Sequence, residues 1–372
     1  MKRFEALDSW RGIAACLVAL HHLSLGVNGH LNQPALIPNS YLFVDFFFVL
    51  SGFVIAANYD KRLAEGFGVW RFALLRFGRL YPLHLAVLLA LIVLRLAHAA
   101  SGLGDPSPFQ APRWSADTIV ASVLLVHSLH LFDFTPWNGP SWSISTEFYT
   151  YLLFAAGVAA CGRRTVLLLL PVAVAGAAAL WILVGGIGTT YDWGLIRCIL
   201  SFSVGALIWH AHRAAWLRSG TTLELTSTVL MVAFVCYAGK GGLSLAAPAV
   251  FGVAVLAFAA EAGAVSRWLR AGALRWLGER SYSIYMVHFL VLWVVADGLK
   301  LLRRVGIDLV AHLQSTSHLW QNDLVALLYI VLVLGTATVT YRTIEVPGRA
   351  WFRRLATPRA RENARIELQS AH

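Results

Sequence analysis

Apolar residues gather in ten stretches along the chain, each long enough to cross a bilayer as a helix. The stretches cover approximately residues 12–27, 41–57, 83–99, 143–160, 165–185, 194–210, 223–239, 245–261, 282–299 and 324–344. A transmembrane helix needs about 20 mostly apolar residues, and polar segments separate these stretches. The pattern predicts an all-α polytopic membrane protein with about ten transmembrane helices. One transmembrane domain fills residues 1–352, and a short basic tail follows at 353–372.

An eleventh, weaker stretch lies at 118–131, and the distribution of charge decides its place. If it does not cross and the N-terminus is cytoplasmic, 22 of the 30 lysines and arginines fall in cytoplasmic segments. If it crosses, the basic segments that follow move outside, against the positive-inside rule. We therefore expect both termini to be cytoplasmic and residues 118–141 to form a re-entrant or interfacial element on the outer side. Such non-helical backbone must be covered by protein or line a cavity.

Composition excludes an ordinary soluble domain. Hydrophobic residues make up 58% of the 372 residues and charged residues only 13%, about half the charged share of soluble proteins. Basic cytoplasmic loops in contact with the lipid bilayer explain the net charge of +11 without a nucleic-acid partner. The four cysteines lie far apart, without a C-x-x-C pair, so we expect neither disulfides nor a metal site.

Ionisable residues in apolar stretches cost about 2.5–3.5 kcal/mol each at a helix centre, so they usually face a cavity or a partner. Arg11 and His22 are eleven residues apart. On a helix this spacing separates them by about 16 Å along the axis and brings their side chains to within about 20° of the same face. The guanidinium could hold an anionic group at the membrane surface while the imidazole reaches its far end. The alternative is an interfacial anchor and a histidine bonded to a neighbouring helix. His21 points about 80° away and is assigned to packing.

Two carboxylates also lie in apolar stretches. Asp45 begins one stretch and could orient a histidine and fix its tautomer, or lie in the outer headgroups as a helix-end carboxylate. Ser51 and Gly52, in the middle of that stretch, allow another helix to pack closely. Glu147 lies about one turn inside its stretch among serines and tyrosines, and we expect it to line a cavity.

Arg76 and Arg79 are three residues apart and share one face of a helix that leads into the third stretch. Paired arginines on rigid backbone suit phosphate binding, although basic residues are also expected there for topology alone. Polar and aromatic groups gather at two further places, which are Trp142 and Ser143 ahead of Glu147, and Tyr285 and His288 in the ninth stretch.

In this order the motifs resemble those of the acyltransferase type 3 family, which comprises bacterial membrane O-acyltransferases. The set is L-D-x-x-R-G-I-A-A followed by a histidine at Leu7–His22, V-D-x-F-F-V-L-S-G-F at 44–53, R-x-x-R with Tyr-Pro at Arg76–Pro82, W-S-x-x-x-E with a following tyrosine at Trp142–Tyr151, S-Y-x-x-Y-x-x-H at Ser281–His288, and I-E-x-P at Ile344–Pro347. Each motif is short, but the ordered set covers nearly the whole chain.

The resemblance implies an enzyme of the bacterial inner (cytoplasmic) membrane that acylates a hydroxyl of surface polysaccharide, lipopolysaccharide or a macrolide sugar. The acceptor would be a carbohydrate, a glycolipid or a glycosylated small molecule. Acyl-coenzyme A, by default acetyl-coenzyme A, would be a co-substrate, with no cofactor bound permanently. The resemblance also implies that Arg11 and His22 are needed for catalysis and that Arg76 and Arg79 contact the coenzyme A phosphates. The resemblance does not decide whether the protein forms a homo-oligomer.

These expectations combine into a mechanistic hypothesis. Arg76 and Arg79, with Arg11 nearby, would hold the donor's phosphates while its pantetheine arm runs inward along the first helix to His22. His22 would then remove the proton of the acceptor hydroxyl as a general base, or take the acyl group first. The sequence leaves both routes open.

Other residues would support His22. Either Asp45 or Glu147 would orient its ring, and either Tyr285 or His288 would donate to the developing oxyanion. Trp142, Ser143, Tyr285 and His288 form the candidate substrate or oxyanion group. The rival class is a transporter or flippase, which also places ionisable residues in its spans. The sequence carries no inverted repeat that would favour it.

Overall fold

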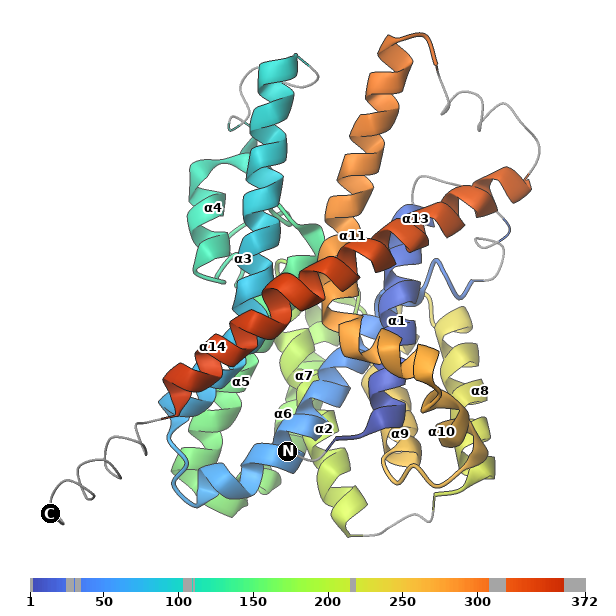
Figure 1. The fold of residues 1–372 in the computed structure, drawn as a ribbon. Coiled ribbons are helices and arrows are strands. Elements are labelled where there is room, and N and C mark those ends of the chain that lie inside the picture. The colour runs from blue at the N-terminus through green and yellow to red at the C-terminus, as the bar shows by residue number, and fades with distance from the viewer. Residues whose placement is uncertain are drawn as a thin grey trace, which may run out of the picture.

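The computed structural model describes residues 3–24, 30, 35–102, 109, 111–214, 219–307 and 319–357. Within these ranges all of the regular secondary structure is helical, without a β-strand (Figure 1). The all-α prediction is therefore confirmed for the part of the chain that the structure describes.

Among the described residues, each of the ten apolar stretches falls for the most part on a different helix. The helices are α1 (Glu5–Ser24), α2 (Phe43–Ala64), α3 (Val69–Ser101), α5 (Trp142–Cys161), α6 (Thr165–Val184), α7 (Gly194–Arg213), α8 (Thr221–Tyr237), α9 (Ala247–Phe258), α11 (Gly272–Arg304) and α13 (Leu319–Thr340). The described residues also form three shorter α-helices, α4 (Ala116–Val123), α10 (Ala264–Leu269) and α14 (Val346–Ala356), besides short 3-10 and π-helical segments.

Six helical segments within the described residues are long and apolar enough to cross a membrane. They are Ser40–Ala64, Val69–Ser101, Gly139–Val184, Gly194–Arg213, Gly272–Arg304 and Leu319–Ala356. Large apolar side chains on their outer faces are exposed, as Ile182 on α6 shows with an exposed fraction of 79%. These features are those of a polytopic membrane protein. The count of ten crossings and the side on which the termini lie stay predictions.

The weak stretch at 118–131 forms the eight-residue helix α4 and then irregular backbone. A helix of eight residues is about 12 Å long, which is too short to cross the hydrocarbon core. The irregular part is covered by protein only in part, because His127, Trp137 and Asn138 are buried whereas Leu124 and Leu131 are exposed. The segment is therefore too short to cross as a helix, and its irregular backbone is partly shielded by protein, as such backbone must be wherever it lies at membrane depth.

Helices α2 and α7 form the tightest contact in the centre of the bundle. A Cβ added to Gly52 would come within 2.0 Å of the Phe202 carbonyl oxygen, and one added to Gly205 within 1.8 Å of the Val49 carbonyl oxygen. Only glycine fits at these two positions. The close packing predicted from Ser51 and Gly52 is confirmed.

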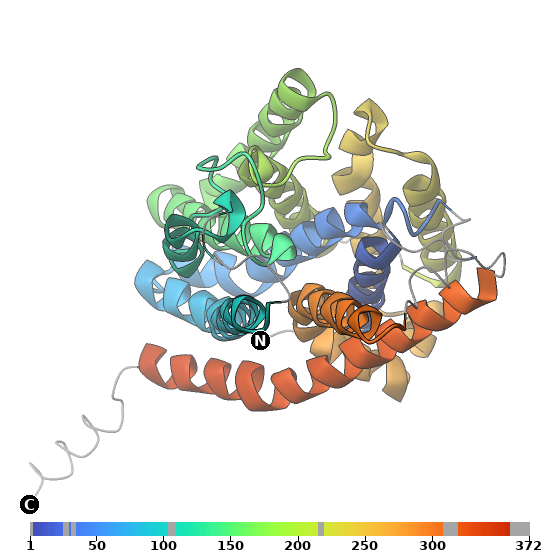
Figure 2. The same ribbon diagram turned by 90° about the horizontal axis from the view of Figure 1, so that it is seen from above.

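The last helices lie across one face of the bundle. Helix α13, the π-helical segment Tyr341–Glu345 and α14 follow one another as one long helix that packs against α11 and α3 (Figures 1 and 2). α11 in turn packs along the whole of α1. This arrangement brings α1, α3, α11 and α14 together at the end of the molecule where α1 begins.

Candidate active site

Helices α1 and α11 cross at very close range. A Cβ added to Gly12 would lie 2.6 Å from the Gly278 backbone nitrogen, so the crossing requires glycine. From this crossing the two helices continue side by side. Arg11 contacts Ser281 and His22 contacts His288, so both predicted residues of α1 face the same neighbouring helix.

Arg11 is held in place by three groups. Its Nε donates to Ser281 Oγ at 2.7 Å, and its Nη2 lies 3.0 Å from Asp8 Oδ1 and 3.4 Å from the Gly278 carbonyl oxygen. The ion pair with Asp8 spans three residues of one helix, while Ser281 and Gly278 belong to α11. The guanidinium is therefore oriented by the crossing of the two helices before any ligand binds.

The hydrogen bonds of His22 determine its tautomer. His22 Nδ1 lies 2.9 Å from the Val18 carbonyl oxygen, and His288 Nδ1 lies 2.6 Å from the Tyr285 carbonyl oxygen. A carbonyl only accepts hydrogen bonds, so each Nδ1 carries a hydrogen. In the neutral ring His288 Nε2 is then an acceptor, and His22 Nδ1 lies 3.3 Å from it. His22 Nε2 is left with a lone pair, which is the form that a base or nucleophile needs.

Two expectations about the surroundings of His22 are not met. Asp45 does not orient it, because the Asp45 carboxylate accepts from Arg197 Nη2 at 2.7 Å and from Ser201 Oγ at 3.0 Å. His288 is not placed as an oxyanion donor, because its one hydrogen is bound to the Tyr285 carbonyl. His288 orients His22 instead.

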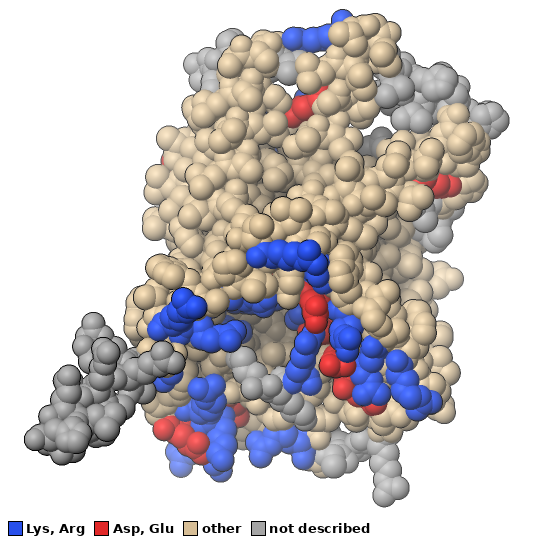
Figure 3. Space-filling model, viewed as in Figure 1, with Lys and Arg blue, Asp and Glu red and all other residues tan. Residues whose placement is uncertain are grey.

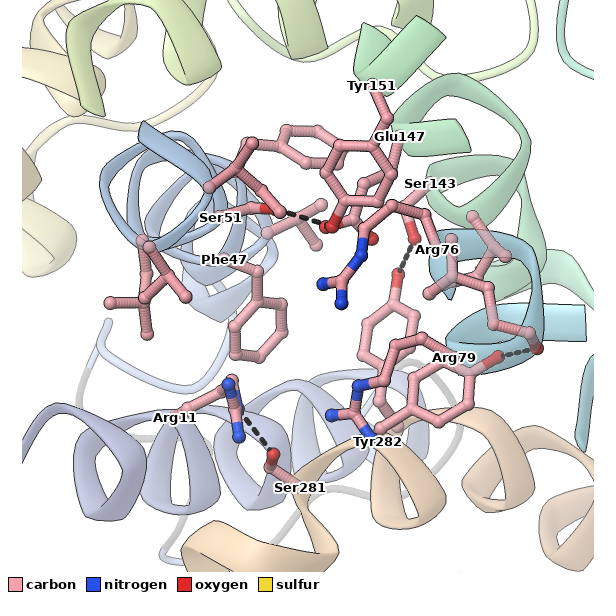
Figure 4. Close-up of a pocket in the computed structure, with 18 residues that line it drawn as sticks. Arg11, Phe47, Ser51, Arg76, Arg79, Ser143, Glu147, Tyr151, Ser281 and Tyr282 are labelled. Carbon is pink, nitrogen blue, oxygen red and sulfur yellow. Dashed lines mark hydrogen bonds between the residues drawn. The ribbon is translucent and has the colours of Figure 1, made fainter. Parts of the chain in front are cut away.

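Glu147 lies elsewhere, in a cavity between α2, α3, α5 and α11 (Figure 4). Its Oε1 accepts a 2.5 Å hydrogen bond from the Tyr151 hydroxyl, whose oxygen lies 2.6 Å from Ser51 Oγ. Since the Tyr151 hydrogen is given to Glu147, Ser51 donates to Tyr151. The cavity-lining position predicted for Glu147 is confirmed, and the hydrogen bonds of the described residues do not connect it to His22.

Three arginines line the same cavity. Arg11, Arg76 and Arg79 point into it from α1 and α3 (Figure 4). Arg76 Nη2 lies 3.4 Å from the Tyr59 hydroxyl, and Arg79 Nη1 is hydrogen-bonded to Glu345. The sequence could place Arg76 and Arg79 on one face of one helix, and the structure adds Arg11 to them.

A wider basic vestibule leads into the cavity from the end where α1 begins. Basic side chains surround a hollow in the half of the molecule that is lower in Figure 3, while the upper half shows few charges. The arginines that line it are Arg3, Arg11, Arg62, Arg71, Arg76, Arg79, Arg349 and Arg353. Only two carboxylates, those of Asp8 and Glu279, belong to the same lining. A polyanion would be drawn into this vestibule.

Two aromatic side chains close the cavity on the side of the histidines. Phe47 and Tyr285 line the cavity, whereas His22 and His288 do not. The Phe47 and Tyr285 rings are 5.5 Å apart edge to face, and the Tyr285 ring is 5.7 Å from that of His288. We call Phe47 and Tyr285 the aromatic wall.

The remaining predicted residues divide between the cavity and the core. Ser143 lines the cavity, and its Oγ lies 2.8 Å from the Tyr285 hydroxyl. Both hydroxyls are also within 3.1 Å of the Pro140 carbonyl oxygen, so Tyr285 is already hydrogen-bonded. Trp142 does not line the cavity. It is buried, with the Arg197 guanidinium 5.2 Å from its ring centre.

Sequence reasoning missed two groups beside these residues. Arg197 lies in the sixth apolar stretch and was assigned no role, yet it is the partner of Asp45. Glu345 was noted only as part of a motif, yet it binds both Arg79 and Arg349. In both cases the signal was an ionisable residue at a helix position that needs a partner.

The fold and the site define a polytopic helical membrane protein with a basic entrance, a polar cavity and a histidine pair. The acyltransferase-domain family matches residues 4–342, which is nearly the whole chain, and the protein therefore belongs to this family. The resemblance read from the motifs is confirmed.

Three relatives are similar to this chain to different extents. Protein 2 of the picA locus of Rhizobium radiobacter is 35% identical over 46% of this chain and 92% of its own length. Acyltransferase MdmB of Streptomyces mycarofaciens is 28% identical over 67% of each chain. Peptidoglycan O-acetyltransferase OatA of Listeria monocytogenes is 22% identical over 94% of this chain, which spans only 56% of the Listeria protein. No solved structure matches the chain significantly.

Proposed function

We propose that the protein transfers an acyl group, by default acetyl, from cytoplasmic acyl-coenzyme A to a hydroxyl of a carbohydrate or glycosylated acceptor. The observation that carries this proposal is the position of Arg11. It lines the cavity at the end of the basic vestibule and shares its helix face with His22. The relatives named as an acyltransferase and a peptidoglycan O-acetyltransferase support the reaction type.

The donor end of the site follows from charge. The nucleotide of acyl-coenzyme A is a polyanion, and guanidinium groups bind phosphates with directed, charge-assisted hydrogen bonds. Arg76, Arg79 and Arg11 would hold these phosphates where the vestibule narrows. The arm of the donor is largely uncharged and carries amide groups. It would extend into the cavity, where Ser51, Tyr151 and Ser143 offer hydroxyl groups.

The chemistry would take place at His22. As the acceptor oxygen bonds to the thioester carbonyl carbon, His22 Nε2 takes the proton of the hydroxyl. The carbon–sulfur bond then breaks, the thiolate receives that proton, and the products are the acyl ester and free coenzyme A. Because the aromatic wall of Phe47 and Tyr285 separates the cavity from the histidines, these two side chains would move aside as the thioester reaches His22.

The test is made with the purified protein in lipid nanodiscs. Incubated with acetyl-coenzyme A and a panel of oligosaccharide acceptors, it should release free thiol and give acetylated sugar in equal amounts, measured by a thiol reagent and by mass spectrometry. A transporter would move the sugar without consuming thioester. The proposal would be overturned if the protein neither bound any acyl-coenzyme A nor released thiol from it.

A further inference from the structure

Glu345 is a buried carboxylate at the edge of the basic vestibule. Its exposed fraction is 1%, and it lies at the end of the π-helical segment between α13 and α14. Its Oε1 is bound by Arg79 Nη1 and lies 3.4 Å from Arg349 Nη2, and its Oε2 accepts from Ser283 Oγ at 2.5 Å. Helices α3, α11 and α14 therefore meet at one carboxylate.

The packing of α14 on α3 fixes this meeting point. A Cβ on Gly348 would lie 2.6 Å from Pro82 Cβ, and one on Gly78 would lie 2.2 Å from Phe352 Cβ. The two glycines let the helix backbones approach until Glu345 lies over Arg79. A π-helical segment is rare and is frequent at functional sites. Here the π-helical segment sets the direction from which the Glu345 side chain approaches Arg79.

The charges at this point do not cancel. Arg79 and Arg349 share the single carboxylate of Glu345, and both arginines line the vestibule. Arg79 also lines the inner cavity, and its guanidinium lies beside the Tyr282 ring, 5.3 Å from the ring centre. One positive charge is left over, and the Arg79 guanidinium points into the cavity (Figure 4).

We propose that Glu345 is a positioning residue that holds Arg79 and Arg349 ready for the phosphates of the donor. It does not touch the acyl group and takes no part in proton transfer. The inference rests on the proposed use of acyl-coenzyme A and deepens it, because it assigns the phosphorylated end of the donor to the contact of α3 with α14. Without Glu345 the two guanidinium groups would repel each other and lose their common orientation.

The experiment compares two donors that differ in their phosphates. Acetyl-coenzyme A carries them and S-acetylpantetheine does not. Glu345→Gln keeps the shape of the side chain and removes its charge. It should raise the KM for acetyl-coenzyme A about tenfold and change the KM for S-acetylpantetheine and both kcat values less than about twofold. Ser283→Ala, which removes one hydrogen bond to Glu345, should give the same pattern at about threefold.

The control is Glu65→Gln, because Glu65 is an exposed carboxylate that pairs loosely with Lys61 and Arg163. It should leave both KM values unchanged. If Glu345→Gln does not fold, which gel filtration will show, Ser283→Ala decides the result with the same two donors. Equal effects on both donors, or none on acetyl-coenzyme A, would overturn the positioning role.

The same assay separates this inference from the proposed function. An unmodified protein that uses neither donor contradicts acyl transfer from coenzyme A itself. An unmodified protein that uses both donors with the same KM remains an acyltransferase but does not recognise phosphates, which overturns the role of Glu345 alone.

Discussion

The imidazole rings of His22 and His288 lie against each other, with His22 Nδ1 3.3 Å from His288 Nε2. The two residues come from helices α1 and α11 and are 266 positions apart in the chain. His288 is itself fixed by the Tyr285 carbonyl, and the Tyr329 hydroxyl donates to the His288 carbonyl at 2.9 Å. The orientation of His22 is therefore set jointly by the Val18 carbonyl of its own helix and by His288 of α11.

Replacement of His288 should lower the rate of acyl transfer without weakening donor binding. His288→Phe keeps the ring volume but removes one of the two acceptors of His22 Nδ1, so the Val18 carbonyl alone holds the His22 ring and its orientation becomes less defined. We expect kcat to fall about tenfold, which is less than the roughly 10²–10⁴-fold effect of general-base catalysis because His22 itself is retained, with the KM for acetyl-coenzyme A unchanged. His288→Gln retains an acceptor oxygen and should recover part of kcat. A raised donor KM with normal kcat would instead place His288 in donor binding.

Loss of Arg76 or Arg79 should weaken the binding of acyl-coenzyme A. A hydrogen bond to a charged group contributes about 1.5–3 kcal/mol, so each arginine-to-alanine change should raise the donor KM about tenfold or more. Steady-state kinetics with varied donor and saturating acceptor measures this. Arg163→Ala is a matched control, because Arg163 is an exposed arginine whose side chain is 80% exposed. A change confined to the acceptor KM would contradict the donor site.

The ion pair of Asp45 and Arg197 should stabilise the fold rather than take part in the reaction. Both side chains are buried, with exposed fractions of 0% and 2%. Asp45→Leu leaves a buried guanidinium unpaired, which costs about 3–5 kcal/mol. The double variant with Arg197→Leu should recover most of that loss. Thermal unfolding of the detergent-solubilised variants measures both. An equal loss of thermal stability in the single and the double variant would contradict the pairing of Asp45 with Arg197.

Sequence alone located the helices well, because a bilayer-spanning helix is encoded by a local stretch of apolar residues. The shared face of Arg11 and His22 was predictable for the same reason, since it depends only on helical period. The positions of Ser51 and Gly52 also predicted a close helix contact, which the structure shows between α2 and α7.

The hydrogen-bond and ion-pair partners of the buried polar residues could not be predicted from the sequence. Asp45 had several possible partners, and only tertiary packing brings Arg197 to it from 152 residues away. The role of His288 depends on which of its nitrogens faces His22, and this follows from the α1–α11 crossing at Gly12 and Gly278. The cavity is likewise formed by helices distant in sequence, so Glu147 was recognised as cavity-lining but linked to the wrong neighbour.

The central claim is that His22 carries out acyl transfer, and a comparison of two adjacent histidines tests it most directly. The His21 ring lies 5.2 Å from that of His22 and 6.1 Å from that of Tyr41, whereas it is the His22 ring that pairs with His288 at 4.9 Å. The measurement is acetyl transfer from acetyl-coenzyme A by His22→Ala and His21→Ala protein in nanodiscs, with correct insertion shown by gel filtration. We predict that His22→Ala loses at least about 100-fold in kcat while it still binds the donor, and that His21→Ala keeps most of the activity. Full activity of folded His22→Ala protein would contradict the account.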